Sequence, residues 1–177
     1  MKNSLQTLAL HRPIVAFSIL LGLLMISPMH AVADDKQDPG KPKGDSKLVV
    51  ILTGLENTKG FVRVSLYNNA SSWKSSMEQE RRVKDYRFLK IPAGKSSRGR
   101  LVINFDEIEA GTYAVSLFHD ENGNGKTDKD FLGLNPTEGF GFSRNFNPRA
   151  KLRAPKFSEC TFDVAKEKTT QISIKLL

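Results

Sequence analysis

The sequence predicts an all-β fold, a single antiparallel β-sandwich of about seven strands with one long Gly/Phe-rich loop. Short segments of alternating apolar and polar residues recur along residues 47–177. Gly, Asn and Asp residues typical of turns separate these segments, and helical periodicity is nearly absent. Residues 47–177 have the size of one ordinary domain, so a single sandwich can bury a sufficient core.

Each expected strand follows from its local pattern. The first is a near-continuous apolar run typical of a buried strand, and the next alternates with Val62, Val64 and Leu66 on one face. The expected strands are 47–53, 60–69, 85–91, 101–105, 112–119, 160–165 and 169–177. The turn-rich residues 54–60 predict a hairpin between the first two strands. A single helical turn is expected within residues 71–80, capped by Ser71 or Ser72.

A tyrosine at the start of the strand 112–119 supports the sandwich. Gly111 stands two residues before Tyr113, at the entry to the most strongly alternating segment. Sandwich folds often place a tyrosine at such a corner, where its hydroxyl bonds to backbone upstream. An ordinary strand tyrosine is the alternative.

The N-terminal residues have the pattern of a secretory signal peptide. A basic start precedes the apolar run 13–26, and Ala31-Val32-Ala33 is a small-residue cleavage pattern. The alternative, a transmembrane anchor, would need roughly 18–20 apolar residues. We therefore expect a signal peptide at 1–33, export to the periplasm or the exterior after cleavage near Ala33, and no membrane span in the mature form. Residues 34–46 are expected to be a disordered leader before the domain 47–177.

The charge of the chain is basic and unevenly placed. Cleavage removes Lys2 and Arg12 from 27 basic side chains and leaves 25 against 19 acidic ones. Residues 81–100 hold eight basic and one acidic side chain, and residues 139–158 hold five basic and none acidic. Such patches attract anionic polymers or membrane head groups, although solvated surface is the simpler explanation. Nucleic acid is not an expected partner of an exported protein. Cys160 is the only cysteine and is expected to be a small buried hydrophobe.

The segment "DENGNGKTD" (120–128) matches part of a calcium loop. The candidate ligands are Asp120, Asn122, Asn124, Asp128 and the backbone carbonyl of Lys126. Alternate oxygens on a tightly curled loop converge on one cation, with Gly125 at the sharp turn. The match is incomplete because Phe131 stands where an EF-hand has its bidentate Glu, so Asp130, Glu138 or a carbonyl would have to complete the shell. A metal-free turn, chosen for its Asn-Gly geometry, remains the alternative.

Catalysis is the third interpretation of this region. His119 is the only histidine left after cleavage, and Glu121 or Glu138 could act with it as acid or base. No G-x-S-x-G, H-E-x-x-H or C-x-x-C motif is present. The simpler interpretation of His119 is a strand-end histidine with one hydrogen bond. The following residues 131–145 are expected to fold back over the sheet edge and bury their phenylalanines, with an exposed aromatic platform as the alternative.

The motifs together resemble a bacterial family of exported proteins, domain of unknown function 2141, over residues 47–177. The signature G-x-Y-A-x-x-x-x-H-D-x-N-x-N-G-x-x-D matches at Gly111, Tyr113, Ala114, His119, Asp120, Asn122, Asn124, Gly125 and Asp128. The family more often has a Pro-Lys-Glu-Gly-type stretch where this chain has residues 135–139. The resemblance implies an immunoglobulin-like or transthyretin-like sandwich, and it implies no activity.

The sequence therefore predicts an exported, non-enzymatic β-sandwich module that calcium stabilises and that binds an envelope or extracellular partner. The alternatives are an envelope hydrolase that uses His119 with an acidic loop residue, and a basic module that binds anionic glycan or lipid.

Overall fold

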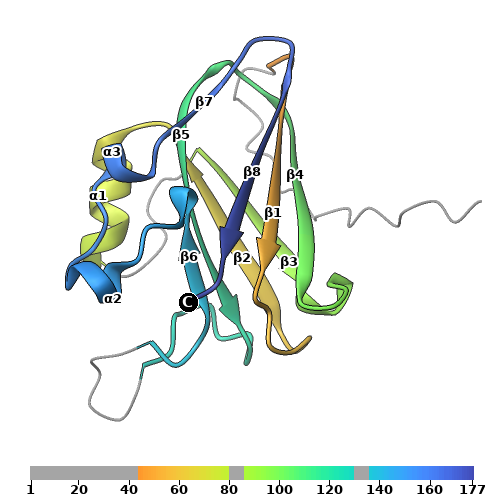
Figure 1. Ribbon diagram of the computed structural model, residues 1–177, viewed down its shortest axis with the longest axis vertical. Helices are drawn as coiled ribbons and strands as arrows, with labels where there is room; N and C mark the ends of the chain where they lie inside the picture. The colour runs from red at the N-terminus through yellow and green to blue at the C-terminus, as the bar shows by residue number, and fades with distance from the viewer. Residues whose placement is uncertain (1–43, 80–85, 130–135) are drawn as a thin grey trace, which may run out of the picture.

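The protein is built from two facing β-sheets (Figure 1). The computed structural model describes residues 44–79, 86–129 and 136–177. The smaller sheet has the order β4-β1-β8 and the larger β3-β2-β5-β6, where β7 also pairs with β5. The strands are β1 (Ser46–Thr53), β2 (Phe61–Tyr67), β3 (Arg87–Pro92), β4 (Arg100–Ile108), β5 (Gly111–Asp120), β6 (Phe140–Phe142), β7 (Phe162–Val164) and β8 (Thr169–Lys175). The helices are α1 (Ala70–Gln79), α2 (Pro148–Lys151) and α3 (Phe157–Cys160), with 3-10 turns η1 (Ala93–Lys95) and η2 (Ser143–Asn145). The expected all-β sandwich is confirmed at this level.

The core lies between the two sheets, where alternate residues of each strand meet. The inward side chains of β1 and β2 are fully buried: Leu48, Val50, Leu52, Val62, Val64 and Leu66. Burying one such aliphatic side chain stabilises a fold by about 1.5–3 kcal/mol. The period-two pattern of the sequence therefore determines which face of each strand packs inward.

Two expectations about strand pairing were wrong. β1 pairs with β8 in parallel, from Lys47 opposite Thr169 to Thr53 opposite Lys175, so the sandwich is not wholly antiparallel. Residues 54–60 form no hairpin, because β1 lies in the smaller sheet and β2 in the larger. Turn-forming residues mark where a chain changes direction, but they do not determine which strand becomes the partner.

The predicted tyrosine corner is present where the chain crosses from β4 to β5. The hydroxyl of Tyr113 donates to the backbone carbonyl of Glu109 at 2.9 Å. Tyr113 is buried beside Tyr86, with ring centroids 5.2 Å apart. Burial raises the pKa of Tyr113 above its usual range, so the hydroxyl stays a hydrogen-bond donor.

The Gly/Phe-rich segment folds back onto the sheet edge, as expected, and forms the strand β6. Its three residues pair with Ser116–Phe118 of β5. The amide of Leu177 donates to the carbonyl of Phe140 at 2.9 Å, so β6 also links the larger sheet to the chain end that follows β8. Phe140 is buried, while Phe131 lies outside the described residues.

The helices α1 and α3 pack on the outer face of the larger sheet (Figure 1). Trp73 of α1 is buried there, and its Nε1 donates to the carbonyl of Pro155 at 2.9 Å. Asn69 caps α1 by accepting the amide of Ser72 at 2.8 Å, so the expected serine cap was wrong. Cys160 is fully buried as expected, and burial raises its pKa to about 12.

The first strand begins a short way into the described residues. β1 begins at Ser46, and the amide of Gly44 already donates to the carbonyl of Glu107 at 3.1 Å. The predicted signal peptide and most of the predicted leader fall in residues 1–43, outside the described residues. In the described part of the chain, no helix is both long enough and apolar enough to span a membrane.

Candidate functional site

The loop that follows β5 is shaped by its own asparagines. Oδ1 of Asn122 accepts the amide of Asn124 at 3.0 Å, and Oδ1 of Asn124 accepts the amide of Lys126 at 2.8 Å. Gly123 and Gly125 have φ of 78° and 82°, a region that favours glycine. Two successive Asx turns therefore curl the loop, as its Asn-Gly pairs predict.

The side chains of Asn122, Asn124 and Asp128 converge above these turns. Nδ2 of Asn122 donates to Oδ2 of Asp128 at 2.5 Å, and Nδ2 of Asn124 donates to Oδ1 of Asp128 at 2.9 Å. Three of the five predicted ligands thus meet at one point, where the carboxylate of Asp128 holds both amides.

Asp120 lies at the base of the loop and faces a different partner. Its side chain is fully buried, and its Oδ2 accepts both Nε of Arg63 and the amide of Gly125, the latter at 3.0 Å. Its Oδ1 is buried with no hydrogen-bond partner among the described residues. Arg63 was not foreseen from the sequence, because the register that sets it diagonally across from Asp120 is a property of the β2–β5 pairing.

Glu138 ties the two ends of the loop together. Its Oε1 accepts the amide of Glu121 at 2.8 Å, and its Oε2 accepts the amide of Asp128 at 3.0 Å. The amide of Thr137 donates to the carbonyl of Asp128 at 2.8 Å. Glu138 is only 5% exposed, so these two bonds to a carboxylate are shielded from water. The structure therefore uses this predicted acid to hold backbone.

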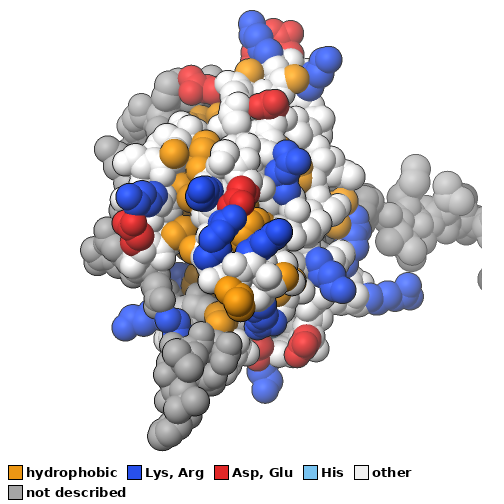
Figure 2. All heavy atoms as spheres, turned by 60° about the vertical axis from the view of Figure 1, so that its left-hand side comes forward, with side chains coloured by type: hydrophobic (Ala, Val, Ile, Leu, Met, Phe, Trp, Pro, Cys, Tyr) orange, Lys and Arg blue, Asp and Glu red, His pale blue; other side chains and the backbone are white. Residues whose placement is uncertain are grey.

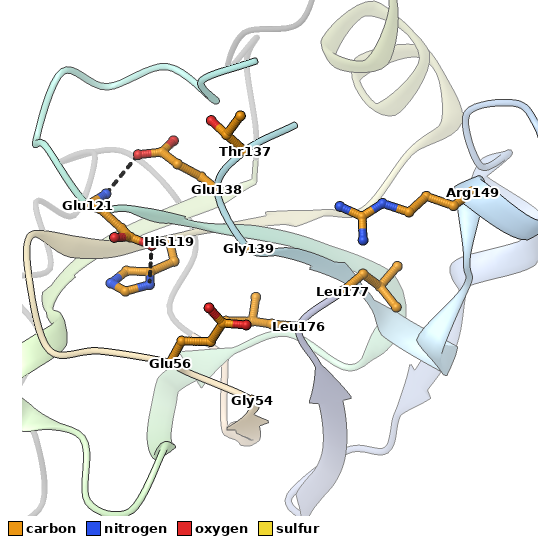
Figure 3. A pocket seen from close by; sticks show the side chains of 10 residues that line it. All are labelled: Gly54, Glu56, His119, Glu121, Thr137, Glu138, Gly139, Arg149, Leu176 and Leu177. Atoms are coloured by element: carbon orange, nitrogen blue, oxygen red, sulfur yellow. Dashed lines mark hydrogen bonds and ion pairs between the residues drawn. The ribbon is translucent and has the colours of Figure 1, made fainter. Parts of the chain in front are cut away.

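His119 lies beside the same clamp, at the wall of a cavity of about 210 Å³ (Figure 3). Its Nε2 contacts the carbonyl of Lys59 at 2.8 Å, and because a carbonyl only accepts, Nε2 carries the hydrogen. Its Nδ1 then faces Oε1 of Glu121 at 3.7 Å. Oε2 of Glu121 accepts Nδ2 of Asn57 at 2.8 Å.

The cavity brings together the residues of the predicted acid–base pair. It is lined by Gly54, Glu56, His119, Glu121, Thr137, Glu138, Gly139, Arg149, Leu176 and Leu177. Figure 3 places Glu56 and Arg149 on different sides of it. His119, Glu121 and Glu138 thus line one pocket, although both oxygens of Glu138 are engaged by backbone amides.

The loop has no preformed site of charged ligands. In the ranges 44–79, 86–129 and 136–177, no three His, Cys, Asp or Glu side chains gather as a metal site. A cation in this loop would therefore depend on amide and carbonyl oxygens in addition to Asp120 and Asp128. Asp130, one of the residues considered for completing the shell, lies outside the described residues.

The two sheets and this polar loop define the protein as a β-sandwich whose candidate site lies in the β5–β6 connection and the adjoining cavity. The chain belongs to the family described as "Uncharacterized protein conserved in bacteria (DUF2141)", whose model matches residues 50–173. No curated protein and no solved structure matches the chain. The family resemblance seen in the sequence is thus confirmed, and it brings no activity with it.

Proposed function

We propose that the protein is an exported, non-enzymatic β-sandwich module, of the immunoglobulin-like or transthyretin-like type, whose β5–β6 loop binds calcium. The observation that supports calcium is the fully buried Oδ1 of Asp120, which has no hydrogen-bond partner among the described residues. Leaving a charged oxygen buried and unpaired costs about 1–3 kcal/mol or more. A cation at this oxygen would remove that cost.

The remaining ligands would come from the cluster above Asp120. Asp128 would turn one oxygen to the metal, and the side-chain oxygens of Asn122 and Asn124, which each accept one backbone amide, would offer their second lone pair to it. Arg63 offsets the charge of Asp120, so the loop has little net negative charge. A weak site of order 10⁻⁴ to 10⁻³ M is therefore expected, as in extracellular calcium modules.

A stabilising role is consistent with the contacts of the nearby titratable side chains. Glu138 fastens the loop to β6 and His119 bonds to the backbone of Lys59, so both act within the fold. The corner hydrogen bond of Tyr113 supports an immunoglobulin-like arrangement. Export is supported by the apolar run 13–26 and the Ala31-Val32-Ala33 pattern. The site would add a further link between the end of β5 and the residues before β6, where an envelope partner would meet a rigid edge.

Thermal unfolding with and without calcium tests this proposal. For a dissociation constant of about 1 mM, about 10 mM calcium stabilises the folded state by about 1.4 kcal/mol. That corresponds to a rise of about 3–6 °C in Tm for a chain of this size. D128N should lose the rise, whereas D163N, which changes an exposed carboxylate on β7, should keep it. An unchanged Tm in wild type at this concentration would remove calcium from the account.

A hydrolase is the second candidate, because His119, Glu121 and Glu138 line one pocket. Its test is turnover of a panel of ester, amide and glycoside substrates by wild type and by H119Q. H119Q retains a donor for the carbonyl of Lys59 and removes the ring nitrogen that faces Glu121. Turnover that H119Q abolishes without a loss of Tm would support the enzyme, and equal rates would exclude this mechanism.

A further inference from the structure

An exposed leucine stands at the end of the short helix α2. Leu152 is 90% exposed, and it is the one large hydrophobic side chain that is exposed among the described residues. It follows Lys151 and precedes Arg153, so basic side chains flank it on both sides. Single exposed apolar residues are common on protein surfaces, so exposure alone carries no conclusion.

The backbone conformation at residue 152 does not favour a leucine there. Its φ of 52° and ψ of 33° lie in the left-handed region, at the position after a helix where glycine is preferred. A side chain at this conformation is unfavourable relative to glycine. Leu152 thus contributes neither to the core nor to the stability of the turn.

The surrounding segment holds Leu152 in a fixed position. Oδ1 of Asn147 accepts the amide of Ala150 at 3.1 Å and so caps α2. Arg153 forms a two-pronged ion pair with Glu159, with N–O distances of 2.8 and 2.5 Å. The guanidinium of Arg153 also lies 5.4 Å from the ring centroid of Phe146. The leucine is therefore presented on an ordered turn.

The segment is strongly basic. Residues 144–159 contain five basic side chains and one acid, Glu159: the basic ones are Arg144, Arg149, Lys151, Arg153 and Lys156. All five are exposed. Figure 2 shows the side of the molecule that carries the helices, where Lys and Arg side chains gather with hydrophobic side chains between them. This face thus combines positive charge with accessible apolar atoms.

We propose that this basic tip docks on the surface of an anionic phospholipid bilayer, with Leu152 entering the boundary between head groups and acyl chains and with Lys151 and Lys156 facing phosphates. Basic side chains are attracted to anionic lipid surfaces, and an apolar side chain beside them gains by leaving water. An anionic polysaccharide would pair with the basic side chains but would provide no apolar environment for Leu152. The combination therefore favours lipid, and it does not depend on calcium binding at the β5–β6 loop.

Vesicle co-sedimentation of the exported chain tests the proposal. Residues 1–33 should be absent, because their apolar run would bind vesicles by itself, and both sheets lie within the described residues that follow. Wild type should bind vesicles with about 30% phosphatidylglycerol and not pure phosphatidylcholine. This binding should weaken strongly near 0.5 M NaCl, where the Debye length is only about 4 Å.

Variants separate the leucine from the charges. L152G should fold with an equal or higher Tm, because glycine suits the left-handed turn, and yet bind anionic vesicles about 10-fold more weakly. L152S serves as a second variant that keeps a side chain. K151E should also weaken binding several-fold, whereas K168E, in the β7–β8 turn, should leave it nearly unchanged.

Three results would overturn the proposal. The first is that wild type shows no preference for anionic over neutral vesicles. The second is that wild type, L152G and L152S bind vesicles equally. The third is that K151E and K168E lose binding equally. Dextran sulfate provides the remaining comparison, since a protein that recognises only polyanions would bind it as well as vesicles and would not distinguish the Leu152 variants.

Discussion

The carboxylate of Glu138 is a point where a conservative change should have a large effect. The substitution E138Q keeps the size of the side chain but replaces one carboxylate oxygen with an NH₂ group. Both oxygens accept backbone amides, from Glu121 at 2.8 Å and from Asp128 at 3.0 Å. One of these amides would therefore face another donor in any orientation of the glutamine.

The expected loss in the free energy of unfolding follows from those two hydrogen bonds. A hydrogen bond to a charged group contributes about 1.5–3 kcal/mol, and a buried donor left unpaired costs about 1–3 kcal/mol. Glu138 is only 5% exposed, so water does not readily replace the lost acceptor. We expect E138Q to lower the free energy of unfolding by about 2–4 kcal/mol. For a chain of this size the loss corresponds to a fall of roughly 5–15 °C in Tm.

Urea unfolding measures the loss, and amide hydrogen exchange identifies its location. The amides of Glu121 and Asp128 should exchange faster in E138Q than in wild type. The amides of the β1–β4 pairing should show a smaller change. E56Q is the matched control, because Glu56 lines the same cavity but is exposed, so its stability should stay close to wild type. If E138Q were as stable as E56Q, with unchanged exchange at both amides, the clamp would contribute nothing and the reasoning would be refuted.

Two further predictions concern close packing and pH. G141A should cost about 1–3 kcal/mol by overpacking, because its Cβ would lie 2.7 Å from Cγ2 of Ile174, whereas G111A meets nothing closer than 3.5 Å and should be nearly neutral. Thermal scans of both variants check this, and equal shifts would contradict it. The ion pair with Arg153 lowers the pKa of Glu159 to about 2, so its stabilising effect is full above the unfolded pKa of about 4.3 and is lost as pH falls towards 2. The stability difference between wild type and E159Q should therefore shrink across that window in low-salt urea titrations, and a pH-independent difference would argue against the pair.

Features that depend only on residues close together in the sequence could be predicted from it. The strand β5 spans Gly111–Asp120, almost as its alternation predicts, because side chains of a strand point to alternate faces wherever it pairs. The corner bond of Tyr113 was predictable for the same reason, since its acceptor lies only four residues upstream. The three-residue strand β6 was not, because it is too short to show a period and exists only by pairing with β5. The parallel partner of β1 is likewise decided by how the chain crosses between sheets.

In the candidate site, too, the contacts within the loop could be predicted and the contact from another strand could not. This difference affects how tightly the loop can bind calcium. The meeting of Asn122, Asn124 and Asp128 follows from their spacing on one curled loop. The partner of Asp120 does not, because Arg63 reaches it from β2 through the sheet register. Arg63 acts as a built-in cation for one carboxylate oxygen and leaves the other buried and unpaired. A metal at the second oxygen would have to bind beside this guanidinium, whose repulsion lowers its affinity. The positive side chain that the sequence could not place is thus the one that limits how tightly the predicted loop can hold calcium.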